Sequence, residues 1–280
     1  MRESWEEFRN ALARGEFSYD ETDKAMATTF LHVFDNMFQY DGVKELLTKR
    51  FKDIRTGEFD LGRGTRLRPE EMTASYDRIM PCSRFITNDN RFSPPGVEWL
   101  YLSLGDKNED GSSNSKEIAQ KECRMHSGEK FAFCQFELPS VYDDLLIVDL
   151  TSGSDLTFEQ LNHGLENYGR YHLERSVAEF FLAGITPNQG LHAEQFRRIV
   201  TEWLVLQYAK MLSKNIFVPV DGRDKSYMYA PFQTIAKYFL NQGYHGIIYK
   251  STVCEGGRNL VLFDKNHAMP YGDVMIEIVG

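Results

Sequence analysis

The sequence predicts an α+β protein, because strand-like runs are grouped in two places while helical spacing fills the segments before and between them. The strand-like runs are short, rich in aromatic and β-branched residues, and bounded by turn residues. No repeat of fixed period is visible, and strands do not alternate regularly with helices as they would in a parallel sheet.

The composition limits the classes of function. The chain has 280 residues, 42% of them apolar, so it can bury a large core. A net charge of −9 argues against direct binding of nucleic acid. The longest apolar runs are far too short for a membrane span, and the first residues lack the features of a secretory signal, so we expect a cytoplasmic protein. Four cysteines lie far apart and indicate free thiols.

The first 60 residues have helical spacing, with Trp5, Phe8 and Leu12 on one stripe. We predict a helical N-terminal region over 1–60 that packs on the rest of the chain or on a partner. Residues 61–95 contain six arginines and no lysine. An arginine-only segment favours an anionic ligand, because guanidinium binds carboxylate and phosphate in a bidentate manner. Ordinary surface pairing with acidic helices explains the same composition equally well.

The remaining residues form the second unit, 61–280. Strands are predicted at 97–104, 130–138 and 145–150, and a helical insertion at about 155–213. A helix over 231–243 ends at Gly243. Three further strands are expected in the runs GIIYKS, NLVLFD and VMIEIV.

Several familiar motifs are missing. The sequence has no GxxxxGK[ST] phosphate loop, no GxGxxG and no GxSxG, which excludes the corresponding nucleotide-binding and hydrolase signatures. One motif is formally complete: the oxygen-rich calcium loop is matched by Asp106, Asn108, Asp110, Gly111 and Glu117. A strand-like run precedes it where a helix should lie, so a solvated acidic loop is the favoured interpretation.

Three ordered segments carry a family resemblance. RFSPPGVEWLYLSL begins at Arg91, IAQKECR contains Glu122, and the run from Tyr229 to Phe263 includes TIAKYFLNQGYHGIIYKSTVCEGGRNLVLF. Together they resemble the RES domain family over roughly residues 61 to 265. The resemblance implies a split β-sheet core similar to that of the ADP-ribosyltransferase toxins.

The resemblance also implies site residues. The family arginine falls on Arg91, the tyrosine on Tyr101, the glutamate on Glu122 and the serine on Ser251. An upstream arginine matches Arg66, and Asn259 is a further candidate for binding a ribose hydroxyl, although a turn residue of this type also bonds backbone. The polar loop at 105–116 and the helical insertion lengthen the intervals on either side of Glu122.

The activity that the resemblance implies is cleavage of NAD between nicotinamide and ribose, with NAD as substrate and no metal. RES proteins are mostly bacterial toxins that hydrolyse or phosphorolyse NAD, or transfer ADP-ribose to protein, and many are inhibited by an Xre-family antitoxin. The residue types suit this chemistry, because a carboxylate stabilises a cationic ribose and arginines bind pyrophosphate. A non-catalytic nucleotide-binding or interaction module is the alternative. Residues 1–60 could form an oligomerisation arm, a partner-binding element or a lid.

Overall fold

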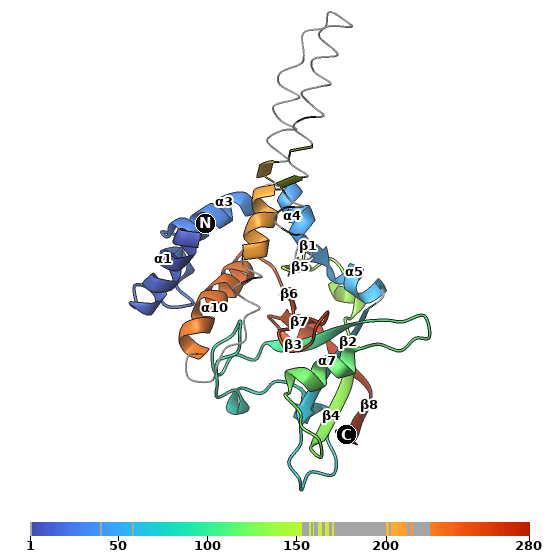
Figure 1. Cartoon of the computed structure of the whole chain (residues 1–280). Coiled ribbons are helices and arrows are strands. Elements are labelled where there is room, and N and C mark those ends of the chain that lie inside the picture. Colours follow the sequence, from blue (N-terminus) through green and yellow to red (C-terminus); the bar gives the residue numbers. More distant parts are fainter. Residues whose placement is uncertain are drawn as a thin grey trace, which may run out of the picture.

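A computed structural model describes residues 2–39, 41–57, 59–152, 200–201, 203–211 and 225–280, together with isolated positions between 157 and 170 and residue 214. Helices and a mainly antiparallel sheet make up this part of the chain (Figure 1), which confirms the α+β class. Most of the helical insertion predicted at 155–213 lies outside the described residues, although 203–211 are helical.

The described strands form one eight-stranded sheet. In spatial order these are β1 (Thr48–Arg50), β5 (Leu146–Asp149), β6 (Gly246–Lys250), β7 (Arg258–Leu262), β3 (Leu100–Asp106), β2 (Phe59–Arg66), β4 (Lys130–Glu137) and β8 (Met269–Ile278). Only the β5–β6 pair is parallel. The two predicted groups of strands are therefore interleaved in one layer.

The sheet opens between β2 and β3. These strands pair only where Phe59–Gly62 face Ser103–Asp106. Beyond Gly62, β2 continues along β4 while β3 continues along β7. The split expected from the family resemblance corresponds to this divergence of two neighbouring strands.

Ala119, Phe131 and Phe133 form a small hydrophobic cluster of their own. The other buried side chains of the strands alternate between two large hydrophobic cores, as expected when successive residues point to opposite faces. One core joins Val261 and Ile247 to α1 (Arg2–Ala13), α3 (Thr29–Phe38) and α10 (Lys225–Asn241), which lie together in Figure 1. The other joins Leu260 and Ile248 to α5 (Phe51–Thr56) and α6 (Tyr76–Ile79). Helices therefore cover both faces.

The N-terminal region packs on the sheet through its aromatic stripe. Trp5 and Phe8 of α1 are buried against Phe30 of α3, and Phe34 meets Phe239 of α10 edge-on. These contacts pack the region on the rest of the chain. Its other helices in the described part of the chain are α2 (Thr22–Ala25), α4 (Asp41–Leu47) and α5. Strand β1 lies in the same region and joins the edge of the sheet. The first core spans both sides of position 60, and the division there stays a prediction.

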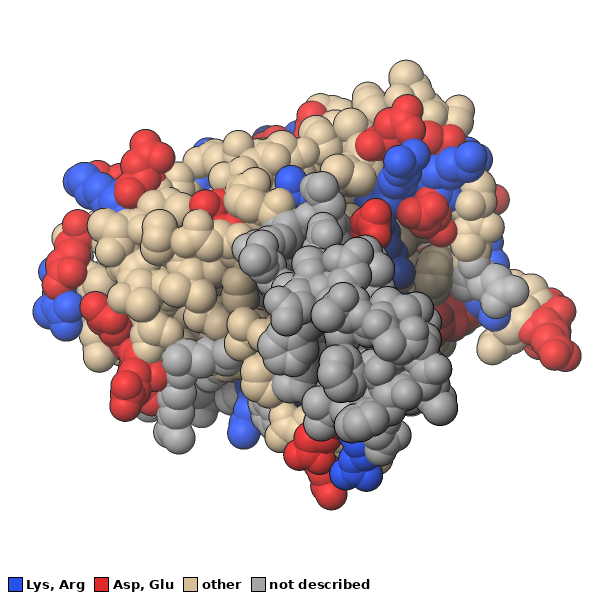
Figure 2. All heavy atoms as spheres, turned by 90° about the horizontal axis from the view of Figure 1, so that it is seen from above, with Lys and Arg blue, Asp and Glu red and all other residues tan. Residues whose placement is uncertain are grey.

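Charges of both signs are mixed over the surface. On the face shown in Figure 2, lysine and arginine side chains lie beside acidic ones in the described part of the chain. Arg55 and Asp143, for example, form an ion pair of 2.6 Å. No helix among the described residues is long and apolar enough to cross a bilayer.

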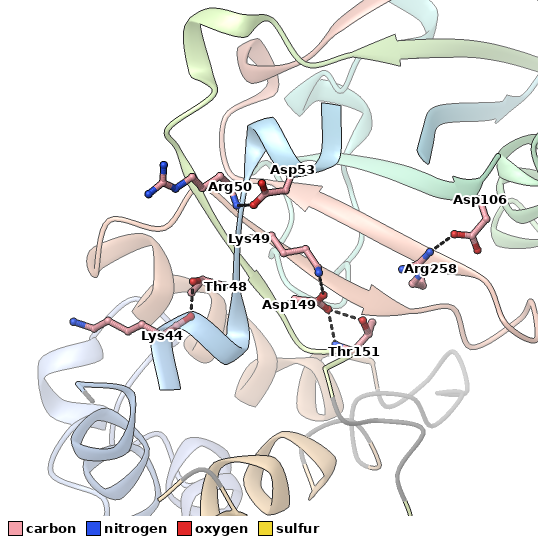
Figure 3. A network of polar contacts seen from close by, with 9 residues as sticks. All are labelled: Lys44, Thr48, Lys49, Arg50, Asp53, Asp106, Asp149, Thr151 and Arg258. Atoms are coloured by element: carbon pink, nitrogen blue, oxygen red, sulfur yellow. Dashed lines mark hydrogen bonds and ion pairs between the residues drawn. The ribbon is translucent and has the colours of Figure 1, made fainter. Parts of the chain in front are cut away.

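A buried carboxylate fastens β1 to β5 at the edge of the sheet (Figure 3). The side chain of Asp149, 5% exposed, lies 3.4 Å from the Lys49 ammonium. Its other oxygen accepts hydrogen bonds from the Thr151 amide at 2.9 Å and hydroxyl at 2.5 Å. These contacts link the N-terminal region to the end of β5.

Replacing Asp149 with alanine is expected to destabilise the protein by about 2 kcal/mol, because it leaves the partly buried amide and hydroxyl of Thr151 without their acceptor. Urea denaturation measures the effect. Asp144→Ala is the control, since the Asp144 side chain is 97% exposed and lies 3.7 Å from Arg50. Equal unfolding midpoints for the two variants would contradict a stabilising role for Asp149.

Candidate active site

A cavity of about 570 Å³ lies where β2 and β3 diverge. Its walls come from β2, β3, β7, α7 (Ser115–Glu122), the residue Tyr229 of α10, and the loop 85–91. This size is in the usual range for small-molecule sites. The cavity thus forms where two neighbouring strands separate, and helices and a loop enclose it.

Glu122 is the last residue of α7 and lines the cavity. Its Oε1 accepts hydrogen bonds from the Ser251 hydroxyl at 2.7 Å and from the Asn259 amide nitrogen at 2.6 Å. Its Oε2 has no partner among the residues that the structure describes. The carboxylate is therefore fixed by one oxygen and has the other available for a ligand.

Ser251 is held in turn by the backbone that follows β6. Its hydroxyl oxygen accepts from the amides of Cys254 at 2.9 Å and Val253 at 3.2 Å, so its proton is directed to Glu122. Asn259 is 3% exposed and pairs with Ser103 and Tyr249 in the sheet. Two neighbouring strands, β6 and β7, thus set the orientation of a carboxylate that α7 carries.

The end of α7 is also fixed. Arg124 has φ 50°, and the following amide, that of Met125, bonds back to the Gln120 carbonyl at 3.2 Å. This left-handed ending usually takes glycine. The Arg66 guanidinium donates to the carbonyl of Arg124 at 2.7 Å and pairs with Glu129 at 3.2 Å. Arg66 therefore supports the helix end from outside the cavity.

Three arginines line the cavity: Arg63, Arg91 and Arg124. Arg91 donates to the Thr252 hydroxyl at 3.3 Å, and its guanidinium carbon lies 5.8 Å from the centre of the Tyr229 ring. The Arg124 guanidinium has no partner within the described part of the chain. The positive charge suits an anionic ligand.

Arg63 occupies the opening between the strands. Its Nε donates to the Ile79 carbonyl at 2.7 Å and its Nη1 to the Tyr101 carbonyl at 2.9 Å. Burial lowers the pKa of this guanidinium from its usual high range. An arginine side chain keeps its positive charge in proteins. Arg63 therefore connects β2 and β3 just beyond the last residues that pair between these strands.

Protonated side chains complete the wall. Burial raises the pKa of Tyr101 and Tyr249, so both phenols stay protonated at neutral pH. The Tyr101 hydroxyl lies 2.9 Å from the Ser93 hydroxyl, which ties β3 to the loop after Arg91. Burial also raises the pKa of Cys123 to about 11, so this thiol is a poor nucleophile. Two carboxylates line the cavity, those of Asp89 and Glu122. Both oxygens of Asp89 accept hydrogen bonds, one from Ser226 and the other from Gln233, so Glu122 is the carboxylate suited to act as a base.

The structure brings most of the residues predicted from the sequence together. Arg91, Tyr101, Glu122 and Asn259 line the cavity, and Ser251 bonds to Glu122 beside it. Arg66 lies outside the lining. The sequence analysis missed Arg63 and Arg124. The signal for Arg63 is its position between Gly62 and Gly64, a pattern that is unusual for a strand.

The residues of the calcium motif have other partners. Asp106 pairs with Arg258, Glu117 with Lys121 at 2.6 Å, and Asp110 accepts from Ser112. No group of three potential metal ligands forms among the residues described. The segment is a polar loop that leads from β3 into α7.

Comparison with known families bears on the C-terminal third. Residues 183–277 match the model of the RES domain family. The family resemblance is confirmed. The RES match includes Ser251 and Asn259, whereas Arg91, Tyr101 and Glu122 lie before its first residue.

Comparison with individual proteins adds little. No curated protein matches the chain. Among solved structures, a chain of the crystal structure of the M. tuberculosis MbcT–MbcA toxin–antitoxin complex is 12% identical, with 84% of this chain and 93% of that chain covered and a TM-score of 0.31.

Proposed function

We propose that the cavity binds NAD and cleaves the bond between its nicotinamide and ribose. The observation that carries the proposal is the Glu122 carboxylate, held through Oε1 by Ser251 and Asn259, in a cavity lined by three arginines and several aromatic residues. The RES match over residues 183–277 supports the same substrate class.

The reaction needs only one carboxylate. The bond between ribose C1′ and the pyridinium nitrogen breaks, and its electron pair stays on that nitrogen, so neutral nicotinamide leaves without protonation. The ribose becomes cationic in the transition state. Oε2 of Glu122 would stabilise that charge and then accept the proton of the incoming nucleophile. Ser251 and Asn259 keep the carboxylate oriented through both steps.

Arg91 would bind the pyrophosphate, with Arg63 and Arg124 adding positive charge to the cavity. Arg91→Ala is expected to raise KM for NAD about tenfold or more and to slow turnover, because charged hydrogen bonds to the substrate are lost. Steady-state kinetics of nicotinamide release measures both. Arg68→Ala is the control, an exposed arginine of the same segment that does not line the cavity. Equal effects of the two changes would contradict the assignment of Arg91.

The identity of the acceptor follows from the products. We would incubate the protein with NAD in three conditions: buffer alone, added phosphate, and added cell extract. Free ADP-ribose indicates a glycohydrolase, ADP-ribose 1″-phosphate indicates a phosphorylase, and label on an extract protein indicates an ADP-ribosyltransferase. Binding of NAD without nicotinamide release in any condition would instead indicate a nucleotide-binding module.

The cellular role is proposed from the RES resemblance. Depletion of NAD would make the protein a toxin, and an Xre-family antitoxin would then be its inhibitor. Induced expression in a bacterial host tests this role. Wild-type protein is expected to stop growth and lower cellular NAD, and Glu122→Gln to do neither.

A further inference from the structure

A large aromatic ring is exposed at the rim of the cavity. Phe85, in the short 3₁₀ helix Ser83–Phe85, is 65% exposed and lines the cavity. The guanidinium carbon of Arg84 lies 4.6 Å from the centre of its ring. An exposed phenylalanine gains by covering its ring, and a planar base would do so by stacking.

We propose that Phe85, backed by Arg84, forms the stacking platform for the adenine base of the dinucleotide. The inference rests on the proposed function and deepens it, because NAD carries a second aromatic base beyond its pyrophosphate. Arg91, the proposed pyrophosphate ligand, follows Phe85 on the same loop. A base platform and a phosphate ligand on one short loop match the order of groups along a dinucleotide.

Hydrogen bonds hold the backbone on both sides of the exposed Phe85 ring. The Ser83 amide donates to Glu98 Oε1 at 2.6 Å, and the other Glu98 oxygen pairs with Lys265 at 2.5 Å. The Gly96 amide donates to the Ile86 carbonyl at 2.9 Å. A backbone held in this way loses little freedom when a base stacks on the Phe85 ring, which favours binding.

Arg84 makes the ring a better partner for a purine. A cation over one ring face is attracted by the π-electrons and holds the ring in place. Arg84 is exposed and near the cavity rim, so its charge also favours a ligand with a phosphate group. An adenine nucleotide satisfies both requirements.

The test is calorimetric titration with ADP, which contains the adenine and the pyrophosphate but has no nicotinamide to lose. Phe85→Ala is expected to weaken ADP binding about tenfold, and Phe85→Trp to retain it. Binding of inorganic pyrophosphate should be unchanged by either substitution. Tyr227→Ala is the matched control: Tyr227 is an exposed ring with Arg9 above it at 5.5 Å, and it does not line the cavity.

Three results would overturn the platform: wild-type protein that does not bind ADP, equal ADP affinity in Phe85→Ala and wild type, or equal weakening of ADP and pyrophosphate by that substitution. The proposed function has its own test, which is whether the wild-type protein releases nicotinamide from NAD. Turnover of NAD with no effect at Phe85 rejects only the platform. Loss of ADP affinity in Phe85→Ala, with no turnover by the wild type, rejects only the reaction.

Discussion

Glu122→Gln is expected to lower turnover of NAD by about a thousandfold while the affinity for NAD stays within a few-fold of wild type. Glutamine keeps the size of the side chain and can still accept hydrogen bonds from Ser251 and Asn259. It removes the negative charge that stabilises the cationic ribose and the base that accepts a proton. Rates of nicotinamide release and calorimetric titration with NAD measure the two effects.

The matched control is Glu117→Gln. Glu117 lies in the same helix, is exposed, and pairs with Lys121 at 2.6 Å outside the cavity lining. This variant should turn over at the wild-type rate. A Glu122→Gln protein that keeps most of its activity, or that loses activity only through lost NAD affinity, would contradict the catalytic role.

Arg63→Met is expected to have the largest effect on stability, a loss of about 3 kcal/mol in the free energy of unfolding. Methionine fills part of the space but cannot donate, so the carbonyls of Ile79 and Tyr101 lose their partner where β2 and β3 separate. The cavity wall would loosen at the same place. Urea denaturation measures the stability, and titration with NAD measures the accompanying loss of affinity.

Arg68→Met serves as the comparison, because Arg68 is exposed two residues after the end of β2. Its unfolding midpoint should match that of wild type. If Arg63→Met unfolds at the same urea concentration as wild type, the hydrogen bonds from Arg63 to the carbonyls of Ile79 and Tyr101 contribute nothing to stability.

Strands with a continuous aromatic or branched pattern could be predicted from the sequence. The runs 130–138 and 145–150 correspond closely to β4 and β5, and GIIYKS to β6. Strand β2 could not be predicted, because FDLGRGTR holds two glycines and two arginines. The structure supplies the reason: a Cβ on Gly62 would lie 2.3 Å from the ring of Phe133, so this strand must lack side chains there.

Site residues could be predicted where the residue type itself indicates a chemical role. They could not be predicted where the fold alone decides which side chain reaches the cavity. Glu122 and Ser251 are far apart in sequence, and only the family resemblance assigns them to one site. In the structure the two side chains form a hydrogen bond of 2.7 Å. The same reasoning placed Arg66 at the substrate, whereas the structure places it on the end of α7. Which arginine of β2 faces the cavity depends on where the β2–β3 ladder ends, and composition carries no information about that.

The most direct measurement is proton NMR of NAD incubated with the purified protein. The spectrum distinguishes nicotinamide that is still joined to ribose in NAD from free nicotinamide. We predict that the wild-type protein releases one free nicotinamide for each NAD consumed, and that Glu122→Gln releases none above background. NAD left intact by the wild-type protein, or equal release by both proteins, would contradict cleavage of the glycosidic bond at this cavity.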